Sequence, residues 1–302
     1  MLCRQLILAI AIPWCCHFMV NNISLSLTEE ILNFLNIDCQ NLWFPGMAEV
    51  IDQHAVSLGW IRVQDYSTSE FITDGKECPI ILSTVLASNG GLMSIRIEHM
   101  TSSLQDKFLA NGIRFLTPSD INTYQSIKII QDSLNFINSN PTLARTIKIL
   151  SKTTHFIKSE NSAYDLSYSD PKIPFSIFVS MASYCSDGAL RLSESIIHES
   201  MHVQLSLIER CIDLVESSKN KYYSPWKKEM RPASGILHAV YVFSVIWQWL
   251  ENLPKTPANE IYVNNRRTQI KFELSQIDVN SCSQDLTSMG QRILFLAINS
   301  LK

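Results

Sequence analysis

Apolar residues recur every three or four positions over much of the chain, which is the spacing of amphipathic helices. The first such segment, 26–37, opens with a Ser/Thr-x-x-Glu capping pattern, and a second, 45–60, has a proline in its first turn. Helical spacing returns over 118–153, with an interruption at "NSNP". After Gly188 nearly everything is helical, and the pattern predicts helices over 188–217, 232–250, 262–276 and 285–300. The chain is therefore predicted to be mostly helical.

Shorter segments have the composition of strands. "CPIILSTVL" and "LMSIRIEHM" are β-rich and are separated by "ASNGG", which predicts a hairpin within 78–100. "SYSDPKIPFSIFVS" has turn residues followed by a short apolar strand over 175–180. We expect an α+β fold, predominantly α-helical with a small β-sheet. Its N-terminal region, 1–160, is predicted to be mostly helical with short β segments, and to form one integrated unit with a catalytic region, 161–302.

Composition narrows the classes of protein to which the chain can belong. With 302 residues, 46% of them hydrophobic and 18% charged, it can bury a substantial core and is not a disordered protein. A net charge of -3 offers no basic excess for phosphates, so nucleic acid is not an expected partner. None of the eight cysteines falls in a C-x-x-C pair, which favours reduced, buried thiols in a cytoplasmic protein.

The N-terminal stretch "MLCRQLILAIAIPWCCHFMV" has one arginine followed by an apolar run, as a signal peptide has. Pro13, Trp14 and His17 interrupt the run, and no A-x-A-like cleavage site follows. We expect a helix without a targeting role, and a signal peptide or membrane anchor is the alternative. The other apolar run, "ILHAVYVFSVIWQWL", carries His238 and Gln248, so no stable membrane insertion is expected.

The candidate chemistry begins at "HESMH", an H-E-x-x-H pattern within the predicted helix 188–217. His198 and His202 are four residues apart, on adjacent turns of one helical face, so both imidazoles can reach one cation. Glu199 projects about 100° round the helix, which suits a general base or an outer partner better than a ligand. Glu194 lies one turn before His198 and is a weaker candidate for an outer partner.

A third histidine follows in "RPASGILHAVYVF". His238 falls on an apolar predicted helix, where a metal shared with His198 and His202 would give its imidazole a partner; the alternative is a histidine satisfied within the core. Arg231 precedes His238 by seven residues, which on one helix is two turns, or about 10.5 Å. This distance would suit an arginine that clamps the far carboxylate of a metal-chelating oxoacid; the alternative is an arginine that caps local structure or pairs with Glu229. The remaining histidines are expected to be ordinary core or surface residues: His17, His54, His99 and His155.

Three segments together resemble one enzyme family: "HESMH" on its long helix, "YYSPWKKEMRPASGILHAVYVF", and "LTSMG" near the C-terminus. They are similar to the 2-oxoglutarate-dependent peptide β-hydroxylases of the H-E-x-x-H type, which modify ribosomally made precursor peptides. The resemblance extends from about Tyr168 to the C-terminus. It implies that His198, His202 and His238 hold Fe(II) and that Arg231 binds the 2-oxoglutarate carboxylate. It also implies that serines and aromatics of "SYSDPKIPFSIFVS" lie beside the site, and that the peptide approaches over Tyr222, Tyr223 and Trp226.

Two other functions stay open from the residues alone. In a zinc metallopeptidase, His198 and His202 would bind zinc, Glu199 would activate a water as general base, and His238 or Glu194 would be the third ligand. Hydrolysis does not require Arg231, and this favours the oxygenase. The other possibility is a non-enzymatic interaction protein in which the H-E-x-x-H pattern is structural.

Overall fold

The computed structural model describes residues 25–36, 41–55, 71–73, 76–78, 80–88, 93–100, 102–110, 112–159, 165–171, 173–181, 185–216 and 219–301. The prediction for the N-terminal apolar stretch lies outside these residues. Two compact units divide the chain. The described residues of the first fall within Ile51–Val203, and those of the second within Phe18–Val50 and Gln204–Lys302.

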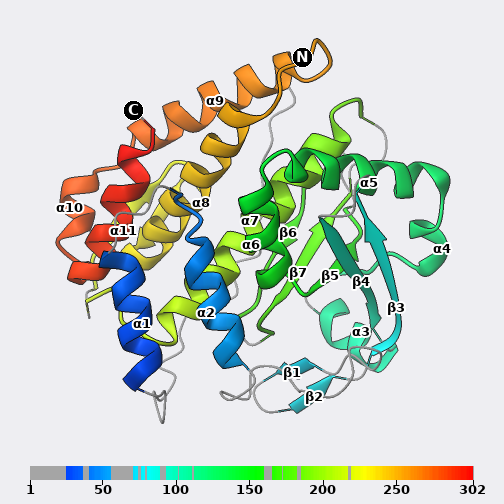
Figure 1. Cartoon of the computed structure of the whole chain (residues 1–302), viewed down its shortest axis with the longest axis horizontal. Helices are drawn as coiled ribbons and strands as arrows, with labels where there is room; N and C mark the ends of the chain where they lie inside the picture. The colour runs from blue at the N-terminus through cyan, green and yellow to red at the C-terminus, as the bar shows by residue number, and fades with distance from the viewer. Residues whose placement is uncertain are drawn as a thin grey trace. The chain divides into compact units, whose positions relative to one another are not determined.

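The first unit is built round a mixed five-stranded sheet of order β3-β4-β5-β7-β6. Its elements in chain order are β1 (Phe71–Thr73), β2 (Lys76–Cys78), β3 (Ile80–Ala87), β4 (Ser94–Met100), α3 (Ser102–Leu109), α4 (Pro118–Ile121), α5 (Tyr124–Asn138), α6 (Pro141–Leu150), β5 (Thr153–Ile157), β6 (Ser167–Tyr168), β7 (Ser176–Ser180) and most of α7 (Gly188–Glu209) (Figure 1). β5 is parallel to both β4 and β7, and β6 is antiparallel to β7 at the edge of the sheet.

The predicted hairpin and strand are confirmed. β3 and β4 are antiparallel, and β7 matches the strand expected near residue 175. The central strand β5 was not predicted. All five of its residues are buried, so the sequence lacks the alternation of polar and apolar residues that marks a half-buried strand. The break at "NSNP" is confirmed, because the Asn140 side chain accepts a hydrogen bond from the Leu143 N–H and caps α6.

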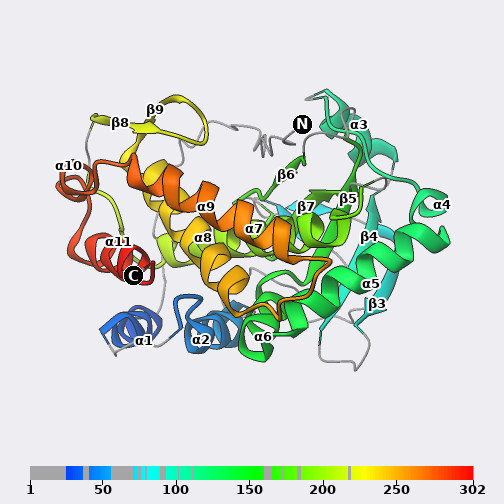
Figure 2. The ribbon, with the colours of Figure 1, turned by 90° about the horizontal axis from the view of Figure 1, so that it is seen from above.

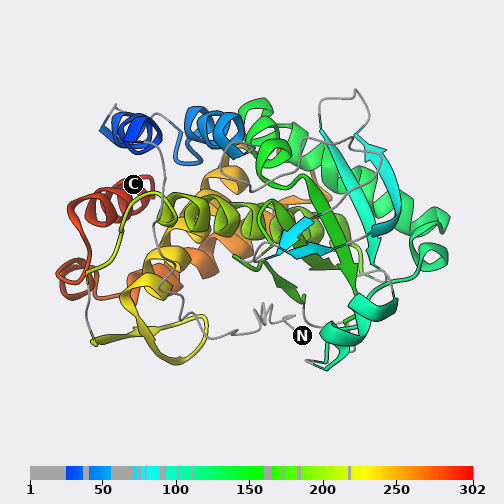
Figure 3. The same ribbon diagram turned by 90° about the horizontal axis from the view of Figure 1, so that it is seen from below.

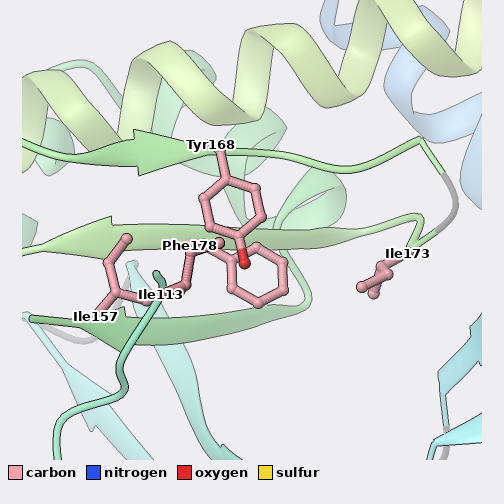
Figure 4. Close-up of a cluster of buried hydrophobic side chains, with 5 residues drawn as sticks. All are labelled: Ile113, Ile157, Tyr168, Ile173 and Phe178. Carbon is pink, nitrogen blue, oxygen red and sulfur yellow. The ribbon is translucent and has the colours of Figure 1, made fainter. Parts of the chain in front are cut away.

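One face of the sheet carries an apolar cluster made by Ile113, Ile157, Tyr168, Ile173 and Phe178. The Tyr168 ring lies over the Phe178 ring, with centroids 4.3 Å apart and planes 10° from parallel (Figure 4). His155 stacks against Phe178 at 4.7 Å, and its Nδ1 lies 3.1 Å from the carbonyl oxygen of Glu98. The expectation of a core histidine at this position is confirmed.

In the residues that the structure describes, the second unit is helical apart from one hairpin and an isolated β-bridge. It contains α1 (Leu25–Asn36), β8 (Lys221–Ser224), β9 (Glu229–Pro232), α8 (Ala233–Asn252), α9 (Glu260–Ser275), α10 (Val279–Ser283) and α11 (Ser288–Asn299); α2 (Pro45–Ala55) begins in it. α8 packs against α9 and α11 and against both strands of the hairpin (Figure 2). By length and composition α8 could cross a membrane, but 78% of its apolar window is buried inside the protein, as in the core helix of a soluble protein.

Helix α7 ends at Glu209, so the prediction of a helix to residue 217 is wrong. The residues after Glu209 form tertiary contacts in place of further helical turns. Val215 forms a β-bridge with Leu286, and the Leu214 carbonyl accepts a hydrogen bond from the Thr287 N–H. A methyl group at Gly290 would lie 2.0 Å from the same carbonyl oxygen, so this close approach requires glycine. The other predicted helices agree with α1, α4, α5, α6, α8, α9 and α11, and with α2 as far as residue 55, beyond which 56–60 lie outside the described residues. Helices α3 and α10 were not predicted. The fold is α+β with a helical majority and a small mixed sheet.

Candidate functional site

The histidines of "HESMH" lie together on α7. The Nε2 atoms of His198 and His202 are 3.2 Å apart, and the ring planes meet at 65°. Two imidazole nitrogens bound about 2.1 Å from one cation, at an angle between 90° and 109°, are about 3.0 to 3.4 Å apart. The pair therefore fits two ligands of a shared metal ion, and a direct hydrogen bond between the rings is the alternative reading of the same distance.

The carboxylate of Glu199 lies beside this pair. Its Oε1 is 3.8 Å from His198 Nε2 and accepts a hydrogen bond of 2.7 Å from the Ser167 hydroxyl. Glu199 is 1% exposed, and a buried carboxylate needs hydrogen-bond donors such as the Ser167 hydroxyl because it has lost its contact with water. The arrangement places a buried carboxylate beside the histidine pair. Ser167, a serine of the 167–180 segment, thus contacts the carboxylate next to the histidine pair.

The edge strand β6 presents Ser167 to α7 because successive side chains of a strand point to opposite faces. Ser167 contacts Glu199, and Tyr168 enters the apolar cluster on the other face, where its hydroxyl is buried. Burial raises the pKa of Tyr168, and the charges of Asp170 and Glu199 raise it further. Among the described residues no side chain or backbone group is a hydrogen-bond partner of that hydroxyl. Tyr168 is therefore held protonated.

A buried ion pair fixes the segment before β6 to the same helix. Arg191, seven residues before His198 on α7, donates from Nε and Nη2 to the two carboxylate oxygens of Asp165 at 2.8 and 2.9 Å. Its Nη1 lies 3.3 Å from Cys185 Sγ. Burial raises the pKa of Asp165 and is opposed by the Arg191 charge. Burial, the largest single effect, works against the charge of Arg191, but the hydrogen bonds and charges of Asp165 and Cys185 together outweigh it and raise the pKa of the guanidinium.

Serine side chains let α7 pack closely on the rest of the first unit. Ser200 Oγ lies 2.6 Å from Ser151 Oγ, at the end of α6. The Ser193 hydroxyl donates to the Ser133 carbonyl of α5. Both serines are fully buried, and their small side chains set the rotation of the helix and hence the direction in which His198 and His202 point.

His238 lies on α8 in the second unit, 3% exposed. Its Nε2 is 3.1 Å from Oε2 of Glu209, the last residue of α7. The end of α7 is held by Gln204, whose side-chain N–H groups donate to the carbonyls of Trp43 and Phe44, and whose Oε1 accepts from the Tyr241 hydroxyl at 2.6 Å. The partner of His238 in this structure is thus a carboxylate.

Arg231 belongs to strand β9, because α8 begins only at Ala233. The prediction that Arg231 and His238 share one helical face is therefore wrong. Pro232, predicted to start the helix, instead has an extended backbone and is its N-cap. The Arg231 Nη1 donates to Glu229 at 2.9 Å, and its Nε would lie 3.5 Å from a Cβ at Gly235 in the first turn of α8. The guanidinium thus lies at the N-terminal turn of α8.

The three aromatic residues predicted for peptide binding have different surroundings. The Tyr222 hydroxyl donates to Asp285 at 2.5 Å, and this bond raises the pKa of Tyr222 to about 12. Trp226 stacks on Phe243 of α8, with centroids 4.6 Å apart. Tyr223 is 45% exposed. Of the three, Tyr223 alone has a largely open side chain.

Within the described residues no group of three or more His, Cys, Asp or Glu side chains is arranged to hold a metal ion. His198 and His202 fit a metal as a pair, and the third ligand stays a prediction. Sequence reasoning missed Asp165, Arg191 and Glu209. An arginine in the apolar surroundings of α7, seven residues before His198, was the one available signal, because such an arginine needs a carboxylate partner.

No protein-family model matches the chain, and no curated protein is similar enough in sequence to be matched.

Proposed function

We propose that this protein is an Fe(II)- and 2-oxoglutarate-dependent oxygenase that hydroxylates the β-carbon of a residue in a ribosomally made precursor peptide. The observation that carries the metal-dependent part is the 3.2 Å separation of the His198 and His202 Nε2 atoms on α7. The choice of iron and the oxoacid rests on the sequence resemblance of the segment that contains Arg231 and His238. The expected setting is cytoplasmic.

In this proposal His198 and His202 provide two ligands and His238 the third. To serve as a ligand through Nε2, His238 must exchange its contact with Glu209 for the metal. Arg231, at the N-terminal turn of α8, binds the distal carboxylate of 2-oxoglutarate, where the helix N-terminus also favours an anion. Iron with 2-oxoglutarate supplies the oxidising power needed to insert an oxygen atom from dioxygen into a C–H bond. Three ligands leave positions open for the oxoacid and dioxygen.

Glu199 and Tyr168 would set the electric charge around the metal. The Glu199 carboxylate, held by Ser167, offsets the positive charge of a cation bound by neutral histidines. Tyr168 stays protonated behind β6 and adds no second negative charge there. Its position beside the histidine pair would also allow Glu199 to accept a proton from a water or a substrate.

The second candidate is a zinc metallopeptidase, and the position of Glu199 favours it. A carboxylate 3.8 Å from His198 Nε2 would lie beside a metal bound by that nitrogen, where a general base is needed to activate a bound water. Ser167 favours the ionised form of this base. In a peptidase, Ser167→Ala should therefore move the acidic limb of the kcat/KM profile to higher pH, whereas Ser167→Thr should restore it.

One assay separates the two candidates and tests the metal site. Anaerobically purified protein is given Fe(II), 2-oxoglutarate and then dioxygen in the presence of candidate peptides. We expect succinate release together with a product heavier by one oxygen atom. Metal-dependent cleavage without 2-oxoglutarate would instead establish the peptidase, and neither product with a tightly bound metal would contradict both enzymes.

Ligand assignments are tested by Co(II) absorption spectra of single variants. His198→Ala and His202→Ala should each weaken Co(II) binding by at least about tenfold, because each removes one of three ligands. The same loss in His238→Ala would support the third ligand, and wild-type affinity there would remove it from the site. His99→Ala, a half-buried histidine of β4, is the matched control and should bind Co(II) normally.

Arg231→Ala should raise the 2-oxoglutarate concentration required for half-maximal turnover by about 30-fold or more, because it leaves a carboxylate unpaired. Glu229→Gln, which keeps Arg231 and removes its carboxylate partner, is the control and should lower or preserve that concentration. An unchanged requirement in Arg231→Ala would refute the role.

A further inference from the structure

The hairpin β8–β9 concentrates positive charge in a chain that is slightly acidic. Its segment "KNKYYSPWKKEMRP" has five basic residues and one acidic residue, a net charge of +4, while the whole chain has -3. Lys221 and Lys228 are exposed, and Lys227 is half-exposed. The one acidic residue, Glu229, is paired with Arg231. Most of the excess charge therefore comes from exposed lysines.

Apolar side chains lie among these lysines. Tyr223 and Met230 are direct cross-strand partners, and they are 45% and 54% exposed. Cross-strand partners share one face of a two-stranded sheet, so the pair forms a small apolar patch on the hairpin. Trp226 and Tyr222, in contrast, are tied to Phe243 and Asp285 and hold the ribbon in place. The hairpin, held by these two contacts, thus exposes a small apolar patch that is flanked by positively charged side chains.

The hairpin β8–β9 forms a separate two-stranded sheet. Figure 2 and Figure 3 show β8 and β9 as a two-stranded ribbon that leads into α8, and in the described part of the chain no third strand pairs with it. An edge strand with unpaired N–H and C=O groups can accept an extended peptide as a further strand. The shape of the ribbon suits an extended polypeptide, and four excess charges are few for a nucleic-acid surface.

The backbone of Lys228 adds an independent indication. Lys228 closes the four-residue turn between the strands, where its N–H donates to the Ser224 carbonyl at 2.7 Å, and its φ is 54°. Glycine or asparagine adopts this left-handed conformation more easily than lysine does. The strained backbone at Lys228 therefore supports a functional role for its side chain.

We propose that hairpin β8–β9 is a docking surface for an acidic, extended segment of the peptide substrate. Acidic side chains of that segment pair with Lys221, Lys227 and Lys228, an apolar side chain covers Tyr223 and Met230, and its backbone pairs with a strand edge. The identity of the occupant as substrate rests on the function proposed above. Docking itself needs neither metal nor 2-oxoglutarate, so it is measured separately from turnover.

The test is fluorescence anisotropy of metal-free protein with a fluorescein-labelled peptide of alternating glutamate and valine. We expect binding that weakens with salt, as exposed charge pairs do. The charge reversal Lys221→Glu/Lys227→Glu/Lys228→Glu should weaken it by about tenfold or more. The matched control is Lys255→Glu/Lys271→Glu, at exposed lysines of the same unit outside the hairpin, and it should bind as the wild type does.

Lys228→Gly separates binding from folding. It relieves the strained backbone, so its Tm should be equal to or higher than that of the wild type, while its affinity for the acidic peptide should fall. Tyr223→Ser/Met230→Ser should weaken binding without changing its salt dependence. Equal affinity for the peptide with lysine in place of glutamate would overturn the proposal. So would tighter binding of phosphatidylserine vesicles or of an oligonucleotide, which would assign the surface to another class of partner.

The two proposals can fail independently. Acidic-peptide binding with no oxygenase activity would keep the docking surface and reject the enzyme. Turnover that is unaffected by the lysine reversal, with no anisotropy change, would keep the enzyme and reject the docking surface.

Discussion

The buried ion pair of Arg191 and Asp165 offers the sharpest test of how the candidate site is held. Both side chains are at most 4% exposed, and two parallel hydrogen bonds join them. Asp165→Asn would leave a guanidinium buried with no carboxylate. Breaking a buried pair at one side costs about 3 to 5 kcal/mol, so we expect that loss in the free energy of unfolding.

The double variant Arg191→Met/Asp165→Leu removes both charges and keeps most of the volume. Replacing such a pair with apolar residues is close to neutral or stabilising, so this variant should lie within about 1 kcal/mol of the wild type or above it. Urea denaturation of the wild type, Arg191→Met, Asp165→Leu and the double variant gives the coupling energy of the cycle. A loss under about 1 kcal/mol for Asp165→Asn would refute the reasoning, since it would mean that water reaches the guanidinium.

Two further predictions concern stability. Burial lowers the pKa of His155 to about 4, so between pH 4 and its ordinary value near 6.5 the unfolded chain binds the extra proton. The contribution of His155 to the free energy of unfolding should thus be intact above about pH 6.5 and fall by about 3 kcal/mol as the pH drops to 4. Urea denaturation of His155→Phe at several pH values should show a free energy of unfolding that lacks this dependence on pH. The same pH dependence in wild type and variant would contradict the assignment. Gly290→Ala should destabilise the protein by about 1 to 3 kcal/mol, because the new methyl meets the Leu214 carbonyl oxygen. Gly235→Ala, which meets only ordinary contacts, should be neutral or slightly stabilising in the same thermal denaturation assay and is the matched control.

Local patterns predicted the helices and the β3–β4 hairpin because their signals lie within one segment. Helical spacing, the Asn140-Pro141 start of α6 and the turn residues before β7 each act over a few positions. Strand β5 and the end of α7 depend on distant partners, namely the neighbouring strands β4 and β7 and the Leu286 backbone. No local sequence pattern reveals those partners. Helical periodicity alone therefore predicted an α7 that continues beyond its actual end at Glu209.

The candidate site divides in the same way. The i, i+4 spacing alone was enough to place His198 and His202 on adjacent turns, and their Nε2 atoms do lie close together. The partners of Glu199 and Arg191 come from residues 32 and 26 positions away, so only the fold brings them together. The prediction for Arg231 was wrong for a different reason. It applied helical spacing from Arg231 to His238, but Arg231 and Pro232 still belong to strand β9.

The order of strands in the first unit has a consequence for how the protein folds. β6 and β7 are consecutive antiparallel strands, so their pairing is local and can form early. The parallel β4–β5 and β5–β7 pairs close longer loops, and such pairings are slow to form. Asp165 and Ser167 contact residues of α7 that lie 26 and 32 positions away, and we expect these contacts to form after the strands have paired. Substitutions at these two positions should chiefly speed unfolding and leave the refolding rate nearly unchanged.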